Sequence, residues 1–135
     1  MTDRELMELA VEARKKAYAP YSGFFVGAAL LGKSGKVYTG CNVENAAYTP
    51  TNCAERTAVF KAVSEGEREF TAIAVVGGKG DALAELCAPC GVCRQVLAEF
   101  CGGDLRVILG TPDALQVTEL WALLPHMFGK KDLRL

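Results

Sequence analysis

The chain has 135 residues, of which 50% are hydrophobic and 23% are charged, and its formal net charge is −1. This length and composition suit one globular domain over residues 1–135 and exclude a disordered chain. Because the basic residues form no dense cluster, the sequence argues against a nucleic acid polymer as partner.

The cellular location is predicted from the N-terminus and the hydrophobic runs. The first ten residues, MTDRELMELA, include acidic side chains and no apolar segment, so we expect no signal peptide. The longest uncharged run, 17–32, is shorter than the ~20 apolar residues of a membrane-spanning helix. We therefore expect a cytoplasmic protein with no membrane partner. In that reducing compartment, six cysteines point to metal binding or catalysis before disulfides.

Helices and strands alternate along the sequence. Thr2 and Glu5 form a capping box, after which apolar residues recur at helical spacing as far as Ala17. Gly66 ends a second helix. The predicted elements, in chain order, are a helix ending before residue 19, strands at 24–31 and 36–43, a helix at 53–64, a strand at 71–77, a helix at 90–100, strands at 105–110 and 114–117, and a helix at 117–125.

This order predicts an α/β fold with a mixed sheet of about five strands. The two strands before the second helix are joined by the short polar turn GKSGK, which indicates a hairpin. In the second half, strand–helix–strand alternation implies parallel pairing. The connection 77–88 carries no clear pattern.

Three cysteines stand at the predicted starts of two helices. Cys53 opens one helix, and Cys90 and Cys93 lie in PCGVC at the start of the next. Helix N-termini carry partial positive charge, which favours thiolate over thiol. If the two N-termini meet at one end of the sheet, three thiolates could hold a tetrahedral zinc and leave a fourth position for water.

Two charged residues follow the first of these cysteines in the sequence CAER. Glu55 is two residues from Cys53, so it does not share its helix face and is placed near the metal water rather than on the metal. A carboxylate there can take a proton from the water and return it to a substrate. Arg56 can donate hydrogen bonds to the thiolates and so restore the Lewis acidity that their negative charge reduces.

Other uses of these cysteines stay open. Cys87, Cys90 and Cys93 form C-x2-C-x2-C, which superficially matches an iron–sulfur run, although the next position of that run is Leu97. Cys87 could also complete a closed structural zinc site. A non-catalytic zinc-binding module would leave Glu55 without a role.

The motifs CAER, PCGVC followed by RQ, and GCNVENAAY together resemble the cytidine deaminase family. Cys53 stands where the general zinc deaminase signature has histidine, which is the pattern of the short, three-cysteine, homotetrameric members. The resemblance extends from YAPYSGFFVGAALL to LLPHMFG, nearly the whole chain. It implies a three-layer fold with helices on both faces of the sheet, and a homotetramer with shared active sites.

The resemblance also implies an activity, which is zinc-dependent hydrolytic deamination of cytidine and deoxycytidine to uridine and deoxyuridine, with release of ammonia, in pyrimidine salvage. Zinc would be held by Cys53, Cys90 and Cys93, and zinc-bound hydroxide would attack C4 while Glu55 shuttles the proton. Arg56 would hydrogen-bond the thiolates. The residues implied in substrate binding are Phe24, Asn42, Glu44, Ala54, Tyr48 and Phe128.

Each of these substrate contacts has an implied role. Asn42 and Glu44 would hold the ribose hydroxyls, Phe24 would pack against the nucleoside, and the backbone near Ala54 would read the pyrimidine. Tyr48 and Phe128 would come from neighbouring subunits, with Phe128 stacking on the base. Another aminopyrimidine nucleoside, such as a blasticidin-type antibiotic, remains an alternative substrate.

Overall fold

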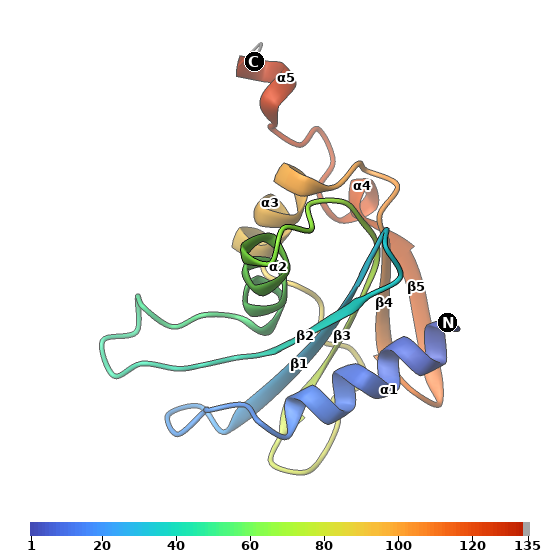
Figure 1. Cartoon of the computed structure of the whole chain (residues 1–135). Coiled ribbons are helices and arrows are strands. Elements are labelled where there is room, and N and C mark those ends of the chain that lie inside the picture. Colours follow the sequence, from blue (N-terminus) through green and yellow to red (C-terminus); the bar gives the residue numbers. More distant parts are fainter. Residues whose placement is uncertain (134–135) are drawn as a thin grey trace.

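The computed structural model describes residues 1–133 and is organised around one five-stranded sheet (Figure 1). The strands lie in the order β2-β1-β3-β4-β5. The elements are α1 (Asp3–Arg14), β1 (Phe24–Gly32), β2 (Val37–Cys41), α2 (Ala54–Ser64), β3 (Phe70–Lys79), α3 (Gly91–Phe100), β4 (Arg106–Thr111), β5 (Ala114–Glu119), α4 (Leu120–Leu123) and α5 (Lys130–Leu133).

The sheet is mixed, as predicted. β1 pairs antiparallel with both β2 and β3, β4 pairs antiparallel with β5, and β3 pairs parallel with β4. The parallel pair is the one that α3 connects, because a parallel pair needs a crossover and the hairpins do not. The predicted hairpin and the predicted parallel pairing are therefore both confirmed.

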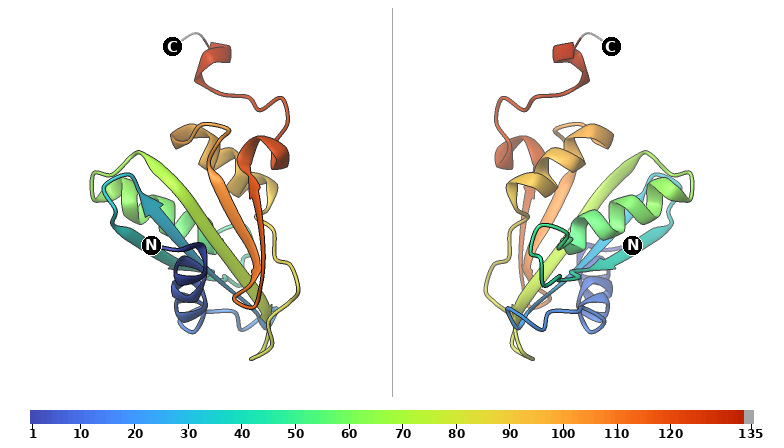
Figure 2. Two further views of the ribbon diagram at one scale, coloured as in Figure 1. Left: turned by 90° about the vertical axis from the view of Figure 1, so that its right-hand side faces the viewer. Right: turned by 90° about the vertical axis from the view of Figure 1, so that its left-hand side faces the viewer.

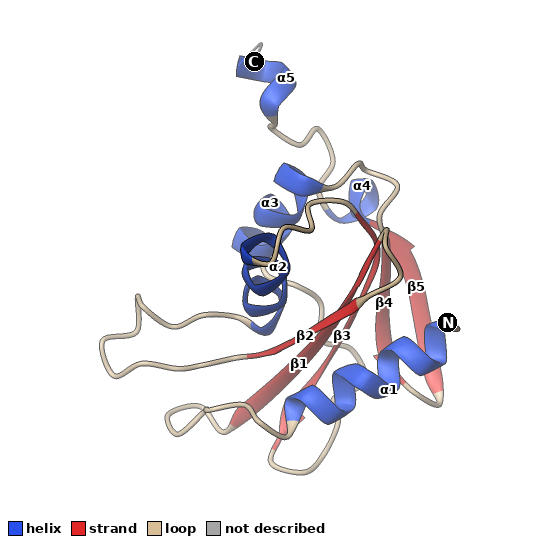
Figure 3. Cartoon of the chain, viewed as in Figure 1, coloured by secondary structure: helices blue, strands red, loops and turns tan. Residues whose placement is uncertain are grey.

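Helices cover both faces of this sheet. α1 lies on one side, and α2 and α3 lie on the other (Figures 2 and 3). Successive residues of β3 point to opposite faces, so Ile73 and Val75 are buried under α2 and α3 while Val76 is buried under α1. Full burial of one such side chain contributes roughly 1.5–3 kcal/mol. The two buried layers therefore show which face of the sheet each helix covers.

The first helix is shorter than its apolar spacing predicts. The capping box of Thr2 and Glu5 is present, but α1 ends at Arg14 rather than continuing past Ala17. The helix ends early because of a contact with a distant segment. The Tyr18 amide donates to the Asn42 carbonyl at 2.9 Å, and Tyr18 pairs with Val43 as an isolated β-bridge instead of continuing the helix.

The last predicted helix is also wrong in extent. The prediction of 117–125 overlaps β5, which runs through Glu119 because its backbone pairs with β4 as far as Arg106. Only Leu120–Leu123 is helical. The strand predicted at 114–117 is confirmed and longer than expected. None of the helices within residues 1–133 is long and apolar enough to cross a membrane.

Candidate metal centre and active site

Three thiols meet where two helices begin. Cys53 is the N-cap of α2, Cys90 is the N-cap of α3, and Cys93 lies in the first turn of α3. Their Sγ atoms all lie within 4.8 Å of one another, and those of Cys53 and Cys90 are 3.8 Å apart. A tetrahedral zinc with Zn–S bonds of about 2.3 Å separates its sulfurs by about 3.8 Å. The spacing and chemistry of the three donors therefore fit zinc.

The local electrostatics favour thiolate at Cys53 and disfavour it at Cys93. A hydrogen bond from the Cys93 thiol is the main cause that lowers the pKa of Cys53 to about 5, and the same bond raises the pKa of Cys93. The Arg56 guanidinium further stabilises the Cys53 thiolate by donating from Nη2 to its Sγ at 3.2 Å. Thiolates are the form that binds metal.

Glu55 is buried beside the cluster. Only 4% of the residue's surface is exposed to solvent, and this burial raises the pKa of its carboxyl group to about 7. Hydrogen bonding with Cys93 opposes this rise in the pKa but is a smaller effect than burial. A carboxyl group in such a position can both accept and donate a proton near neutral pH.

Arg56 lies against the cysteine cluster, with its Nη2 donating to the Cys53 sulfur. Hydrogen bonds to Cys53, followed by those to Cys93, raise the pKa of the guanidinium and keep it charged. Its Nε atom is buried and has no hydrogen-bond partner among the described residues. Within residues 1–133, the guanidinium therefore contacts the cysteine sulfurs and forms no ion pair with a carboxylate.

Cys87 lies outside this group of thiols. The metal-binding group found within residues 1–133 contains Cys53, Cys90 and Cys93 and does not include it. Burial raises the pKa of Cys87 to about 11, which disfavours the thiolate that a metal requires. Both the iron–sulfur run and the closed four-cysteine zinc site are therefore disfavoured.

Two of the residues expected to bind substrate are in contact, Phe24 as the first residue of β1 and Asn42 directly after β2. Phe24 is half-buried, and its carbonyl accepts a hydrogen bond from the Asn42 side chain at 2.8 Å. Asn42 also accepts from the Val26 amide at 2.8 Å. Its amide group keeps one hydrogen and one lone pair for a ligand. Ala54, the first residue of α2, is fully buried.

Glu44 and Tyr48 line a hollow of about 300 Å³ beside these residues. The Glu44 carboxylate accepts from the Tyr21 amide at 3.0 Å and from the Ser22 amide and hydroxyl at 3.1 and 2.5 Å. These bonds lower the pKa of Glu44, the Ser22 hydroxyl being the largest cause. Tyr48 is 75% exposed and has a φ of 63°, which is costly for a non-glycine residue.

Phe128 lies apart from these residues, on the chain that follows α4. Its side chain is 57% exposed, and its carbonyl accepts from Gln95 Nε2 at 2.8 Å. The loop between β2 and α2 and the segment after α4 both project from the body of the molecule (Figure 1). In one chain, neither Tyr48 nor Phe128 is covered.

The comparisons with known proteins agree on one family. The model for the cytidine and deoxycytidylate deaminase zinc-binding region matches residues 1–111. The chain is 50% identical to the cytidine deaminase of Sporosarcina psychrophila over 134 residues, covering 98% of this chain and 96% of that protein. It is also 50% identical to the cytidine deaminase of Halalkalibacterium halodurans over 133 residues, covering 97% and 98%. This chain belongs to the cytidine deaminase family.

The cytidine deaminase fold is confirmed by a crystal structure. The enzyme from Burkholderia pseudomallei superposes with a TM-score of 0.85 at 51% identity, over 95% of this chain and all of that one. The predicted three-layer α/β class is therefore correct. The family model covers all three clustered cysteines and Glu55, whereas Phe128 lies beyond its end.

Two supporting residues of this cytidine deaminase were missed by sequence reasoning. Arg94 donates to the Pro89 carbonyl and to the Leu123 carbonyl, each at 2.7 Å, and Gln95 holds the Phe128 backbone. The signal was present, because both residues belong to the RQ that follows PCGVC. Ordinary polar residues in a helix gave no reason to assign them a role.

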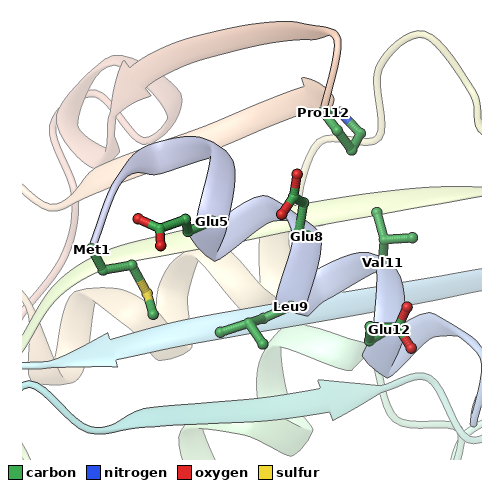
Figure 4. A pocket seen from close by; sticks show the side chains of 7 residues that line it. All are labelled: Met1, Glu5, Glu8, Leu9, Val11, Glu12 and Pro112. Atoms are coloured by element: carbon green, nitrogen blue, oxygen red, sulfur yellow. The ribbon is translucent and has the colours of Figure 1, made fainter.

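The molecule also has a hollow larger than the one lined by Glu44 and Tyr48, and it lies away from the cysteine site. It measures about 610 Å³ and lies between the outer side of α1 and Pro112, with Glu5, Glu8 and Glu12 along it (Figure 4). α1 covers the face of the sheet opposite α2 and α3, so this hollow is not part of the cysteine site. A row of glutamates on an exposed helix is an ordinary solvated face.

Proposed function

We propose that the protein is a zinc-dependent cytidine deaminase that converts cytidine and deoxycytidine, with water, to uridine and deoxyuridine and ammonia. The observation that carries this proposal is the buried Glu55 beside three thiols at two helix N-termini. The names of the related proteins support the choice of substrate.

We assign Cys53, Cys90 and Cys93 as the zinc ligands. Zinc held there would supply Lewis acidity, which lowers the pKa of a water molecule. Glu55 accepts the proton that the water loses and delivers it to the ring nitrogen of the pyrimidine. It then accepts the remaining proton of that water, now on the C4 hydroxyl group, and delivers it to the amino group, so that the C4–N bond breaks, ammonia leaves and the C4 carbonyl of uridine forms. Because Glu55 is buried, the proton is not lost to solvent between these steps.

The substrate is held at the edge of this site by residues of three segments. Phe24 packs on the nucleoside, Asn42 and Glu44 bind the ribose hydroxyls, and the backbone at Ala54 contacts the ring. The support for this assignment is that hydrogen bonds to the backbone fix Asn42 and Glu44 while leaving each a free acceptor site. We place the enzyme in the cytoplasm, since its six cysteines are all free. The role in pyrimidine salvage is what the family resemblance implies.

The deciding experiment compares wild type with Glu55→Gln at matched zinc content. Glutamine has nearly the same shape but cannot carry the proton, so we expect kcat to fall by about 10²- to 10⁴-fold with fold and zinc retained. Loss of the cytidine absorbance band measures turnover, and metal analysis measures zinc. Equal turnover by the two proteins would contradict the role of Glu55. A zinc-loaded wild type that leaves cytidine unchanged would contradict the substrate.

A further inference from the structure

We propose that Arg14 is a positioning residue that fixes the connection between β3 and α3 and, through it, the geometry of the three-cysteine site. The inference rests on the proposed metal site. Arg14 is the last residue of α1 and is only 8% exposed, although it is charged. A buried charge is costly unless it is paired or hydrogen-bonded, so its partners reveal its role.

The partners of Arg14 are backbone carbonyls. Its Nε donates to the Phe25 carbonyl at 2.9 Å, and its Nη2 faces the carbonyls of Gly78, Gly80 and Ala82 at 2.8, 2.5 and 3.0 Å. Across the described part of the chain, no carboxylate forms an ion pair with it. One guanidinium therefore joins the start of β1, the end of β3 and the turn that follows.

That turn belongs to a segment without regular secondary structure. Between the end of β3 and the start of α3, the chain has no helix or strand. It folds back on β3, because the Ala84 amide donates to the Gly77 carbonyl at 2.8 Å. The approach is tight, since a Cβ on Gly78 would lie 1.9 Å from the Ala82 carbonyl oxygen. The Arg14 hydrogen bonds hold this turn from the other side.

The same connection then leads to the metal site. Cys87 packs against Gly77, where an added Cβ would lie 2.8 Å from its Sγ. Pro89 is fully buried, and its carbonyl accepts from Arg94 immediately before Cys90. The segment that carries Cys90 is thus anchored at Arg14 on one side and at Arg94 on the other.

Arg14 acts at a distance from the cysteines. α1 covers the opposite face of the sheet from α2 and α3, and its C-terminal end meets the turn after β3 at one end of the sheet (Figures 1 and 2). Lysine at this position would keep the charge but lose the planar fork that reaches several carbonyls at once. The prediction is a looser connection and a weaker metal site in an otherwise folded protein.

The test compares Arg14→Lys with Arg4→Lys in the full-length protein. Arg4 lies on the same helix but is exposed, and its ion pairs within residues 1–133 are with Glu8 and Asp113. Zinc affinity is measured by chelator competition at a temperature where both variants are folded, and the cobalt-substituted proteins report the thiolate–metal absorption. We expect Arg14→Lys to bind zinc about tenfold more weakly than Arg4→Lys, with a changed cobalt spectrum.

Hydrogen exchange separates a local effect from a general loss of stability. In Arg14→Lys the Ala84 amide should exchange faster while the amides in the middle of α2 keep their protection. Zinc affinity and Ala84 exchange indistinguishable from those of Arg4→Lys would overturn the proposal.

If Arg14→Lys does not fold, Gly78→Ala tests the same contact, because the added methyl group displaces the Ala82 carbonyl while Arg14 stays intact. A wild type that binds zinc without deaminating cytidine would overturn the proposed function but leave this comparison decisive.

Discussion

Arg56 shows how one side chain changes the chemistry of its neighbours. Three thiolates around a divalent zinc leave a net negative charge, which opposes the activation of water. The guanidinium donates to Cys53 and lies within hydrogen-bonding reach of Cys93, so it withdraws charge from two of the three sulfurs. Under the proposed function, Arg56 would act on the zinc through these sulfurs.

We predict that Arg56→Gln folds but loses function. Glutamine cannot supply the positive charge, so we expect zinc affinity or kcat to fall by about 10- to 100-fold. Zinc competition and cytidine turnover measure the two effects separately. Arg56→Lys restores the charge without the fork and should recover part of the loss. A glutamine variant with wild-type affinity and turnover would show that the sulfurs do not depend on this charge.

At the level of elements, the position of α2 depends on a residue without a side chain. A Cβ on Gly40 of β2 would lie 2.4 Å from the Ala54 carbonyl oxygen and 2.6 Å from the Ala58 amide. The first turn of α2 therefore lies directly on β2, which places Cys53 at the end of the sheet. A side chain there would move the helix and the thiol together.

The hairpin that contains β2 is held by a carboxylate. Glu67 accepts from the Ser34 hydroxyl at 2.5 Å, the Ser34 amide at 3.1 Å and the Tyr38 hydroxyl at 3.0 Å. The Ser34 hydroxyl bond is the largest cause that lowers the pKa of Glu67 from its ordinary value of 4.5. Glu67 thus ties the β1–β2 turn to the segment before β3.

This pairing predicts a pH-dependent contribution to stability. A carboxyl group whose pKa is lowered by folding stabilises the fold above its unfolded pKa, and the contribution disappears as the pH falls through the folded pKa. We expect Glu67→Gln to unfold at lower urea than wild type at neutral pH, and the difference to close as the pH falls below 4.5. Urea unfolding across a pH series measures it. A difference that persists unchanged in acid would assign the effect to packing.

At the level of the whole molecule, one chain leaves two aromatic residues uncovered. Tyr48 and Phe128 are 75% and 57% exposed on segments that project from the body (Figure 1). Exposed aromatic residues on projecting segments are suited to contact another protein surface. This exposure supports the proposal of a homotetramer in which each active site is completed by neighbouring chains.

Shared sites predict complementation between inactive variants. Glu55→Gln lacks the proton carrier, and Phe128→Ala lacks the aromatic ring offered to the neighbour. In mixed oligomers, some sites combine an intact Glu55 with an intact Phe128, so cytidine turnover should rise above that of either variant alone. Light scattering establishes the oligomeric state, and differential tags establish the mixing. Mixed oligomers with no added activity would show that each site is built within one chain.

The sequence by itself determined the features that depend on local patterns. The polar turn GKSGK located the hairpin, helical apolar spacing located the first helix, and the capping box of Thr2 and Glu5 was correctly read as a helix start. The placing of Cys53 and Cys90 at helix starts was also correct. Such signals are contained in a few neighbouring residues, and the motif resemblance added the family.

Only the tertiary structure decided what depends on residues far apart in the chain. α1 stops at Arg14 because Tyr18 pairs with the segment after β2, and β5 replaces part of a predicted helix because it pairs with β4. Cys87 is three residues from Cys90 yet lies outside the metal group, which its spacing could not reveal. Arg14 lies inside the first helix predicted from the sequence, and only the fold brings four backbone carbonyls to its side chain. Long-range pairing and burial, rather than local preference, set these features.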